Sequence, residues 1–226
     1  MKPEWRSARS GSARRGVNLE AVRRPRRCQD PATATSTTLP TRSRARQKNP
    51  TDAAFEQDYN AQVAVDQGSL LIVGWALSNH PNDSQEAEPT LAAMPSAIGM
   101  PTAAALDAGY AGPATVTACE KRGIEPYIAT GRDPHHASWQ QRFAPLSEPP
   151  PVEASPQVKM AYKLRTVLGK AIFGARKCTV EPVIGIIKEV LGFRQFSLRG
   201  ERAAAGEWCL VCLAFNLKRF HTLFWA

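Results

Sequence analysis

The chain has 226 residues, a formal net charge of +9 and a hydrophobic content of 43%, which is enough for a sizeable core. This length suits one α/β domain with tails, and no apolar run approaches the roughly 20 residues that a membrane-spanning helix needs. Five scattered cysteines, an odd number, argue against a disulfide framework. We therefore expect a protein of the reducing cytoplasm without a membrane partner.

The charge falls into three blocks. Residues 1–48 carry 13 Lys/Arg and three acidic residues. Residues 49–158 carry four Lys/Arg and 13 acidic residues, and residues 159–226 carry 12 Lys/Arg and four acidic residues. The last block has helical periodicity, so it predicts a folded basic face. Such a face beside acidic residues suits a phosphate backbone, and double-stranded DNA is the partner that we expect.

Residues 1–48 are rich in Arg, Ser, Thr and Pro, and VNLEAV (17–22) is their only strand-like fragment. A segment of this kind buries too little apolar surface to offset its ordering entropy. We therefore expect a disordered basic segment over 1–48 and a folded domain over 49–226.

The pattern of the folded part predicts a hairpin followed by a βαβ unit. The strand-like run 59–77 turns at Asp66-Gln67-Gly68, and a helix follows it with Asp83 or Ser84 as the N-cap. A short strand ends at Asp107, residues 113–123 form a helix, and 125–130 form a second strand, parallel to the first. Helices then run from about residue 159 to the end, with a break at 191–193.

Asp107 is the first candidate for chemistry. It stands at the carboxyl end of a parallel strand, where open α/β sheets place ligands. An aspartate at such a point also serves as a turn former or helix cap. Both interpretations remain open for Asp107 by itself.

Glu181 is the second candidate, in the run FGARKCTVEPVIGIIKEVLGFRQF (173–196). On a helix it shares a face with Lys177 and Lys188, which fits either a solvated charge pair or a functional acid. Pro182 predicts a kink or a new helix start at this point. Paired across the fold, Asp107 and Glu181 could hold Mg²⁺ or Mn²⁺ and so act in phosphodiester chemistry.

Several motifs in order resemble the C-terminal part of a bacterial insertion-sequence transposase of the DDE type. They are YNAQVAVD (59–66), NDSQ (82–85), DAGY (107–110), RGIEPYIATGRD (122–133), RKCTVEPVIGIIKEVLGFRQFSLRG (176–200) and GEWCLVCLAFNLKRFH (206–221). The resemblance covers about residues 47–221. It implies an RNase H-like mixed sheet with C-terminal helices, and metal-dependent cleavage and strand transfer of insertion-sequence DNA.

The resemblance also implies roles for single residues. Asp107 and Glu181 would be catalytic, metal-binding acids, with Mg²⁺ or Mn²⁺ as the cofactor. The family pattern of Tyr, Arg, Glu and Lys has Phe173 in place of its Tyr, and either Arg176 or Lys177 as its Arg. The expected DNA contacts are Arg176, Lys177, Lys188 and Arg194. A homodimer is a further partner that the resemblance allows.

The first acid of the family pattern has no evident counterpart. It belongs on a central first strand ahead of the hairpin, and before Tyr59 only VNLEAV, with Glu20, has strand character, without a supporting motif. We therefore expect a sheet that lacks its first strand. The resulting hypothesis is a truncated, inactive transposase remnant, and its alternative is a basic DNA-binding fragment without chemistry.

Overall fold

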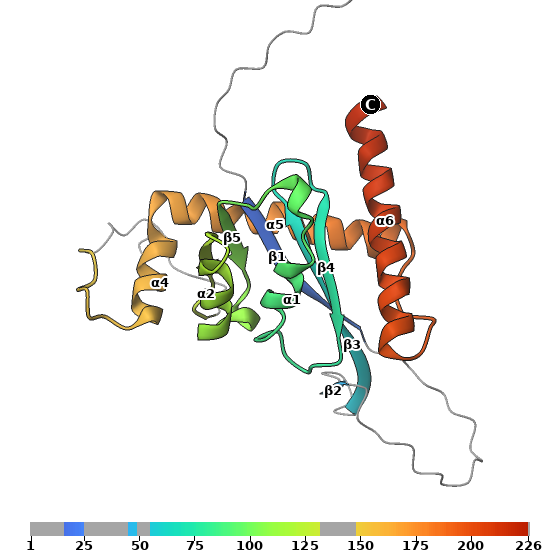
Figure 1. The fold of residues 1–226 in the computed structure, drawn as a ribbon, viewed down its shortest axis with the longest axis horizontal. Coiled ribbons are helices and arrows are strands. Elements are labelled where there is room, and N and C mark those ends of the chain that lie inside the picture. The colour runs from blue at the N-terminus through green and yellow to red at the C-terminus, as the bar shows by residue number, and fades with distance from the viewer. Residues whose placement is uncertain (1–15, 25–44, 49–54, 132–147, 226) are drawn as a thin grey trace, which may run out of the picture.

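The computed structural model describes residues 16–24, 45–48, 55–131 and 148–225 (Figure 1). Within these ranges six strands form one mixed sheet in the order β2-β3-β1-β5-β6, and β4 pairs with β3. The strands are β1 (Gly16–Arg24), β2 (Ala45–Lys48), β3 (Phe55–Asp66), β4 (Ile72–Ser78), β5 (Ala103–Leu106) and β6 (Glu125–Ile128). The predicted mixed α/β class is confirmed.

The expectation that the sheet lacks its first strand is wrong. β1 lies in the middle of the sheet, antiparallel to β3 from Val17↔Asp66 to Arg24↔Tyr59 and parallel to β5 from Gly16↔Ala103 to Leu19↔Leu106. The segment 1–48, expected to be disordered, thus contributes β1 and β2, and its remaining residues lie outside the described ranges. β1 forms because it pairs with β3 along one edge and with β5 along the other. The local sequence of β1 does not reveal these pairing partners.

The hairpin and the βαβ unit are confirmed. β3 and β4 pair antiparallel, and their turn is closed by the Asp66 carboxylate, which accepts hydrogen bonds from the backbone N–H (2.8 Å) and the hydroxyl (2.7 Å) of Ser69. β5 and β6 pair in parallel. In the chain they are connected by α2 (Pro113–Glu120), which begins with a proline. Gly123 follows with φ of 67°, the left-handed conformation that glycine adopts readily.

Helices cover both faces of the sheet (Figure 1). On one face lie α1 (Ala87–Ala92), the 3₁₀ turn η2 (Ala108–Tyr110) and α2; η1 (Ser96–Ile98) is a further 3₁₀ turn that follows α1. The C-terminal part comprises α4 (Pro156–Arg165), α5 (Val167–Gly185), the π-helical η3 (Ile186–Val190) and α6 (Glu201–Trp225). Among the described helices, none combines the length and the hydropathy that crossing a bilayer would require.

Alternation along β3 divides the core into two clusters. Ala64 packs with Leu19 and Leu106 beneath α1 and α2, whereas Val63 packs on the other face with side chains of α5 and α6. Because successive strand residues point to opposite faces, β3 serves both clusters at once. The second cluster includes Val180, Val183 and Ile187 from α5 and η3, and Trp208, Cys212 and Phe215 from α6.

Candidate functional site

Asp107 directly follows β5 and caps η2. Its carboxylate accepts a hydrogen bond from the backbone N–H of Ala108 at 2.8 Å, and its side chain is half exposed. The aspartate is therefore a turn former, and it also keeps a carboxylate at the edge of the sheet where ligands bind in α/β folds. The two interpretations of Asp107 are compatible.

A buried polar network lies beneath the loop that carries Asp107. The Asn60 amide donates to Asp83 Oδ1 at 2.8 Å, and the Gln62 amide donates to Asn60 Oδ1 at 2.8 Å and to Asp83 Oδ1 at 3.3 Å. The Tyr110 hydroxyl donates to Gln62 Oε1. These four residues are at most 6% exposed, so their hydrogen bonds satisfy polar groups that would otherwise be costly to bury.

Gly109 allows the backbone of the loop after β5 to approach the Asp83 side chain closely. A Cβ atom at Gly109 would lie 2.6 Å from Asp83 Oδ2, closer than a real Cβ contact. The motifs around Asn60, Asp83 and Tyr110, far apart in the sequence, thus form one hydrogen-bonded support for the loop after β5. The sequence interpretation overlooked this role, although Asn60 and Gln62 alternate within an otherwise apolar strand and so carry a readable signal.

Arg176 of α5 faces Asp107. Its Nη2 lies 3.7 Å from Asp107 Oδ1, its guanidinium lies 5.5 Å from the centre of the Phe173 ring, and the residue is only 9% exposed. It belongs to the inward face of α5 together with Val180 and Val183. Arg176 was predicted to contact DNA, but this burial leaves it little surface for a phosphate.

Glu181 lies on a different face of α5. It is exposed and follows Arg176 by five residues, which corresponds to a rotation of about 140° and a rise of about 7.5 Å along the helix. Lys170 and Lys177 are also exposed. Lys177 precedes Glu181 by four residues and Lys170 precedes Lys177 by seven, so all three share one face of the helix. The arrangement brings Asp107 together with Arg176 and leaves Glu181 among lysines.

The remaining predicted DNA contacts follow Pro182. α5 continues through this proline to Gly185, so the predicted new helix start does not form. The wider π-turn begins at Ile186, where the Leu191 N–H donates a hydrogen bond to the Ile186 carbonyl at 2.9 Å. Lys188 is half-buried within this π-turn. Arg194 is exposed and forms an ion pair with Glu189.

The predicted pairing of Asp107 and Glu181 around Mg²⁺ or Mn²⁺ stays a prediction. No group of three His, Cys, Asp or Glu side chains within the described ranges is arranged to hold a metal ion. The Asp107 carboxylate has the Arg176 guanidinium as its neighbour, and Glu181 is exposed on α5. Mg²⁺ is usually bound by one or two carboxylates and keeps waters in its remaining octahedral positions, so it requires few protein ligands.

Comparison with known families identifies the class of protein. Residues 34–217 match the family model described as a transposase DDE domain. Because the match covers most of the chain, the protein belongs to the DDE transposase family, and its function is related to DNA transposition. β1 precedes the matched region. No curated protein matches the sequence at a significant level.

Proposed function

We propose that this chain is an RNase H-like transposase domain that binds DNA but does not cut it. The strand order supports the RNase H-like assignment: a central β1 has the β3–β4 hairpin on one side and the parallel strands β5 and β6 on the other. The observation that carries the proposal is the 3.7 Å approach of Arg176 to Asp107. A fixed positive charge at the acid disfavours a second cation there, and Glu181 is too far around the helix to compensate.

The exposed face of α5 supports DNA binding. Lys170 and Lys177 extend from it into solvent, and the surrounding block 159–226 has a large excess of basic residues. Phosphate contacts of this kind give affinity without sequence specificity and make binding sensitive to salt. Glu181 then acts as a local counter-charge to these lysines. This corresponds to the interpretation of its sequence motif as a solvated charge pair.

A salt titration tests the DNA-binding part. We expect the full chain to bind a short mixed-sequence duplex with an affinity that falls steeply as salt rises, and the double variant Lys170→Gln/Lys177→Gln to reduce the magnitude of the log–log slope by about two, at roughly 0.9 per lost phosphate contact. Lys121→Gln is the matched control, because Lys121 is exposed in the acidic block of the chain. Equal slopes for all three proteins would contradict the proposal.

Metal-dependent cleavage by an intact transposase is the second candidate, and the register of β1 supports it. Leu19 pairs with Leu106, so the next residues along the two parallel strands are Glu20 and Asp107. In antiparallel pairing Glu20 is opposite Val63, which belongs to the face covered by α5. Glu20 therefore has the register position that the first acid of the family pattern would need.

A nicking assay separates the two candidates. Supercoiled plasmid carrying candidate terminal repeats is incubated with the full chain and either Mg²⁺ or Mn²⁺. The proposal expects bound but intact plasmid. Metal-dependent nicking that disappears in both Asp107→Ala and Glu20→Ala, while duplex binding persists, would establish the second candidate instead.

A further inference from the structure

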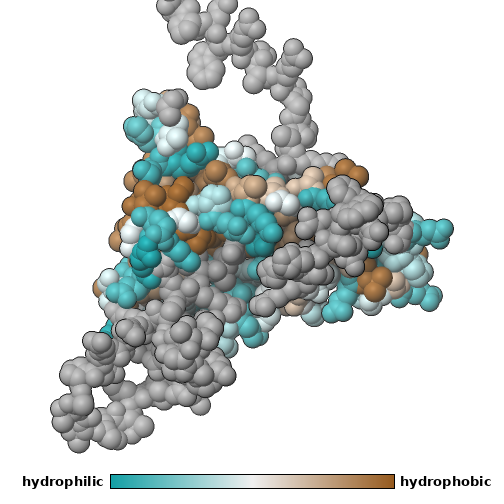
Figure 2. All heavy atoms as spheres, turned by 180° about the vertical axis from the view of Figure 1, so that it is seen from behind, coloured by the Kyte–Doolittle hydropathy of each residue, from teal (hydrophilic) through white to brown (hydrophobic). Residues whose placement is uncertain are grey.

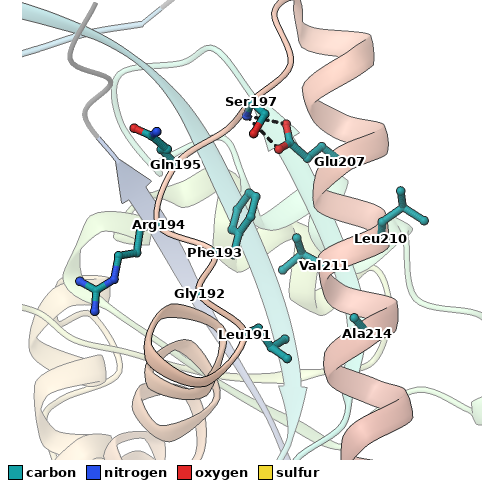
Figure 3. A pocket seen from close by; sticks show the side chains of 10 residues that line it. All are labelled: Leu191, Gly192, Phe193, Arg194, Gln195, Ser197, Glu207, Leu210, Val211 and Ala214. Carbon is teal, nitrogen blue, oxygen red and sulfur yellow. Dashed lines mark hydrogen bonds between the residues drawn. The ribbon is translucent and has the colours of Figure 1, made fainter.

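Two glutamates outside the candidate site, Glu207 and Glu86, are held in different ways. Both carboxylate oxygens of Glu207 accept the backbone N–H of Ser197, at 2.8 Å and 3.0 Å, at the polar end of a groove beside α6 (Figure 3). Glu86 is only 1% exposed, and its Oε1 contacts the imidazole of His80, whereas its Oε2 has no hydrogen-bond partner among the described residues. Burial of a carboxylate in this way is costly, so Glu86 depends on His80.

The contact between His80 and Glu86 joins an exposed ring to a buried carboxylate. His80 Nδ1 lies 2.6 Å from Glu86 Oε1, and the side chain of His80 is 53% exposed. A protonated ring neutralises the carboxylate. A ring that has lost its second proton can still donate from Nδ1, but the buried anion is then uncompensated. Histidine is the side chain whose charge ordinarily changes between about pH 5 and 8, so this contact is sensitive to pH.

The two residues close the loop between β4 and α1. His80 follows the end of β4 by two residues, and Glu86 is the N-cap residue of α1, where its carbonyl accepts the Thr90 hydroxyl at 2.7 Å. Between them lies Asp83, whose backbone carbonyl accepts the Glu86 N–H at 3.0 Å. The contact between His80 and Glu86 therefore helps to fix the position of Asp83.

Asp83 connects this loop to the loop that carries Asp107. Its Oδ1 accepts the side-chain amides of Asn60 and Gln62, and its Oδ2 lies against Gly109, two residues after Asp107. A displacement of Asp83 would leave both amides without their shared acceptor and would remove a contact beneath the Asp107 loop. The position of the loop between β4 and α1 thus affects the support of Asp107.

The other titratable groups around α1 do not compensate Glu86. The described ion pairs give Glu86 no cation besides His80, and Arg122 is paired with Glu88 at 2.7 Å. Burial raises the pKa of the Cys119 thiol to about 11, so this thiol stays neutral near pH 7. The remaining groups are either exposed or already hydrogen-bonded; they are Asp83, Asp107, Tyr110, Glu120 and Lys121.

We propose that His80 and Glu86 form a pH-sensitive latch, which holds the loop 79–86 and, through Asp83, the support beneath Asp107. The latch is closed while the pair retains its shared proton, and it opens as rising pH removes that proton and leaves the buried anion uncompensated. The closed state binds one proton more than the open state. Closure is therefore favoured at the acidic end of the range in which histidine titrates and is lost as pH rises through it.

The latch lies on the face of the sheet opposite to α5. α1 belongs to the cluster with Leu19 and Leu106, whereas α5 packs in the cluster on the other face. Figure 2 shows the molecule from behind, which is the side of α5, and hydrophilic side chains lie there beside hydrophobic ones. The DNA-binding proposal rests on α5, so the latch does not depend on it and is tested without DNA.

Amide hydrogen exchange of the full chain tests the latch. Exchange is followed by mass spectrometry at about pH 6 and about pH 8 and corrected for the intrinsic rates at each pH. We expect protection of the segments 79–86 and 107–111 to fall by about tenfold between the two conditions in the wild type. Glu86→Gln removes the buried charge, so protection should be similar at both pH values. His80→Gln leaves the charge uncompensated, so protection should be low at both.

His221→Gln is the matched control, because His221 is an exposed histidine on α6. It should retain the pH dependence of the wild type, and circular dichroism verifies that each variant is folded. Protection of the wild type that is independent of pH, or an equal pH dependence in Glu86→Gln, would overturn the latch. A change confined to the segment 79–86, without one at 107–111, would overturn its connection to Asp107.

Discussion

The two acids that the sequence singled out have opposite surroundings. Asp107 is held by its own turn, by Arg176, and by the buried network beneath the loop. Glu181 is exposed on the solvent face of α5, which it shares with Lys170 and Lys177. Acids that look equivalent in a motif can therefore differ in how firmly the fold positions them, and only a firmly positioned acid is pre-organised for chemistry.

Removing the acid of the buried network should have the largest effect. Asp83→Ala leaves the amides of Asn60 and Gln62 without their shared acceptor, and we expect a loss of about 3 kcal/mol in the free energy of unfolding. Urea unfolding monitored by circular dichroism measures it. Gln85→Ala, exposed and two residues away, is the control, and a similar midpoint for both variants would mean that the network adds no stability.

A methyl group at Gly109 should have the next largest effect. In Gly109→Ala the new Cβ meets Asp83 Oδ2 at 2.6 Å, so the loop or the network must move, and we expect a cost of about 1–3 kcal/mol. Gly112→Ala is matched to it, because Gly112 has open space around it and an extended φ of 172°. Thermal unfolding of the two variants provides the measurement, and identical transitions would refute the close approach.

Arg176 and Glu181 offer the direct comparison within α5. Arg176→Met removes the cation from a 9% exposed position beside Asp107, and we expect about 1–2 kcal/mol of destabilisation. Glu181→Gln changes an exposed group and should stay within about 0.5 kcal/mol. Chemical denaturation of both variants checks the difference; a larger loss for Glu181→Gln would mean that Glu181, and not Arg176, is the residue that the fold depends on.

The smallest effect concerns the exposed ion pair between Glu88 and Arg122. A hydrogen bond from Arg122, at 2.7 Å, lowers the pKa of Glu88 below its usual 4.5. A lowered folded-state pKa stabilises the fold above the unfolded pKa, and this stability is lost as pH falls through the folded value. Because Glu88 is largely exposed, we expect less than about 1 kcal/mol. Glu88→Gln should flatten the stability-versus-pH curve below pH about 4.5, and an unchanged curve would exclude the coupling.

Local sequence patterns predicted most elements of the fold. The apolar alternation of 59–77 and the turn at Asp66 led to the hairpin, and proline and glycine at the ends of α2 bounded that helix. β1 was missed because its local pattern is weak and its pairing partners, Tyr59–Asp66 and Ala103–Leu106, are distant in sequence. The network was missed for the same reason, since its donors and acceptors come from three separate motifs.

The sequence by itself determined the α/β class, the hairpin, the βαβ unit and the candidate acids, because these depend on periodicity and on residues close together in the chain. The tertiary structure decided that β1 is central, that Arg176 is buried beside Asp107, and that Glu181 is exposed. These outcomes depend on pairing register and on the rotation of α5 against the sheet. Both are set by contacts between distant segments, which no local pattern encodes.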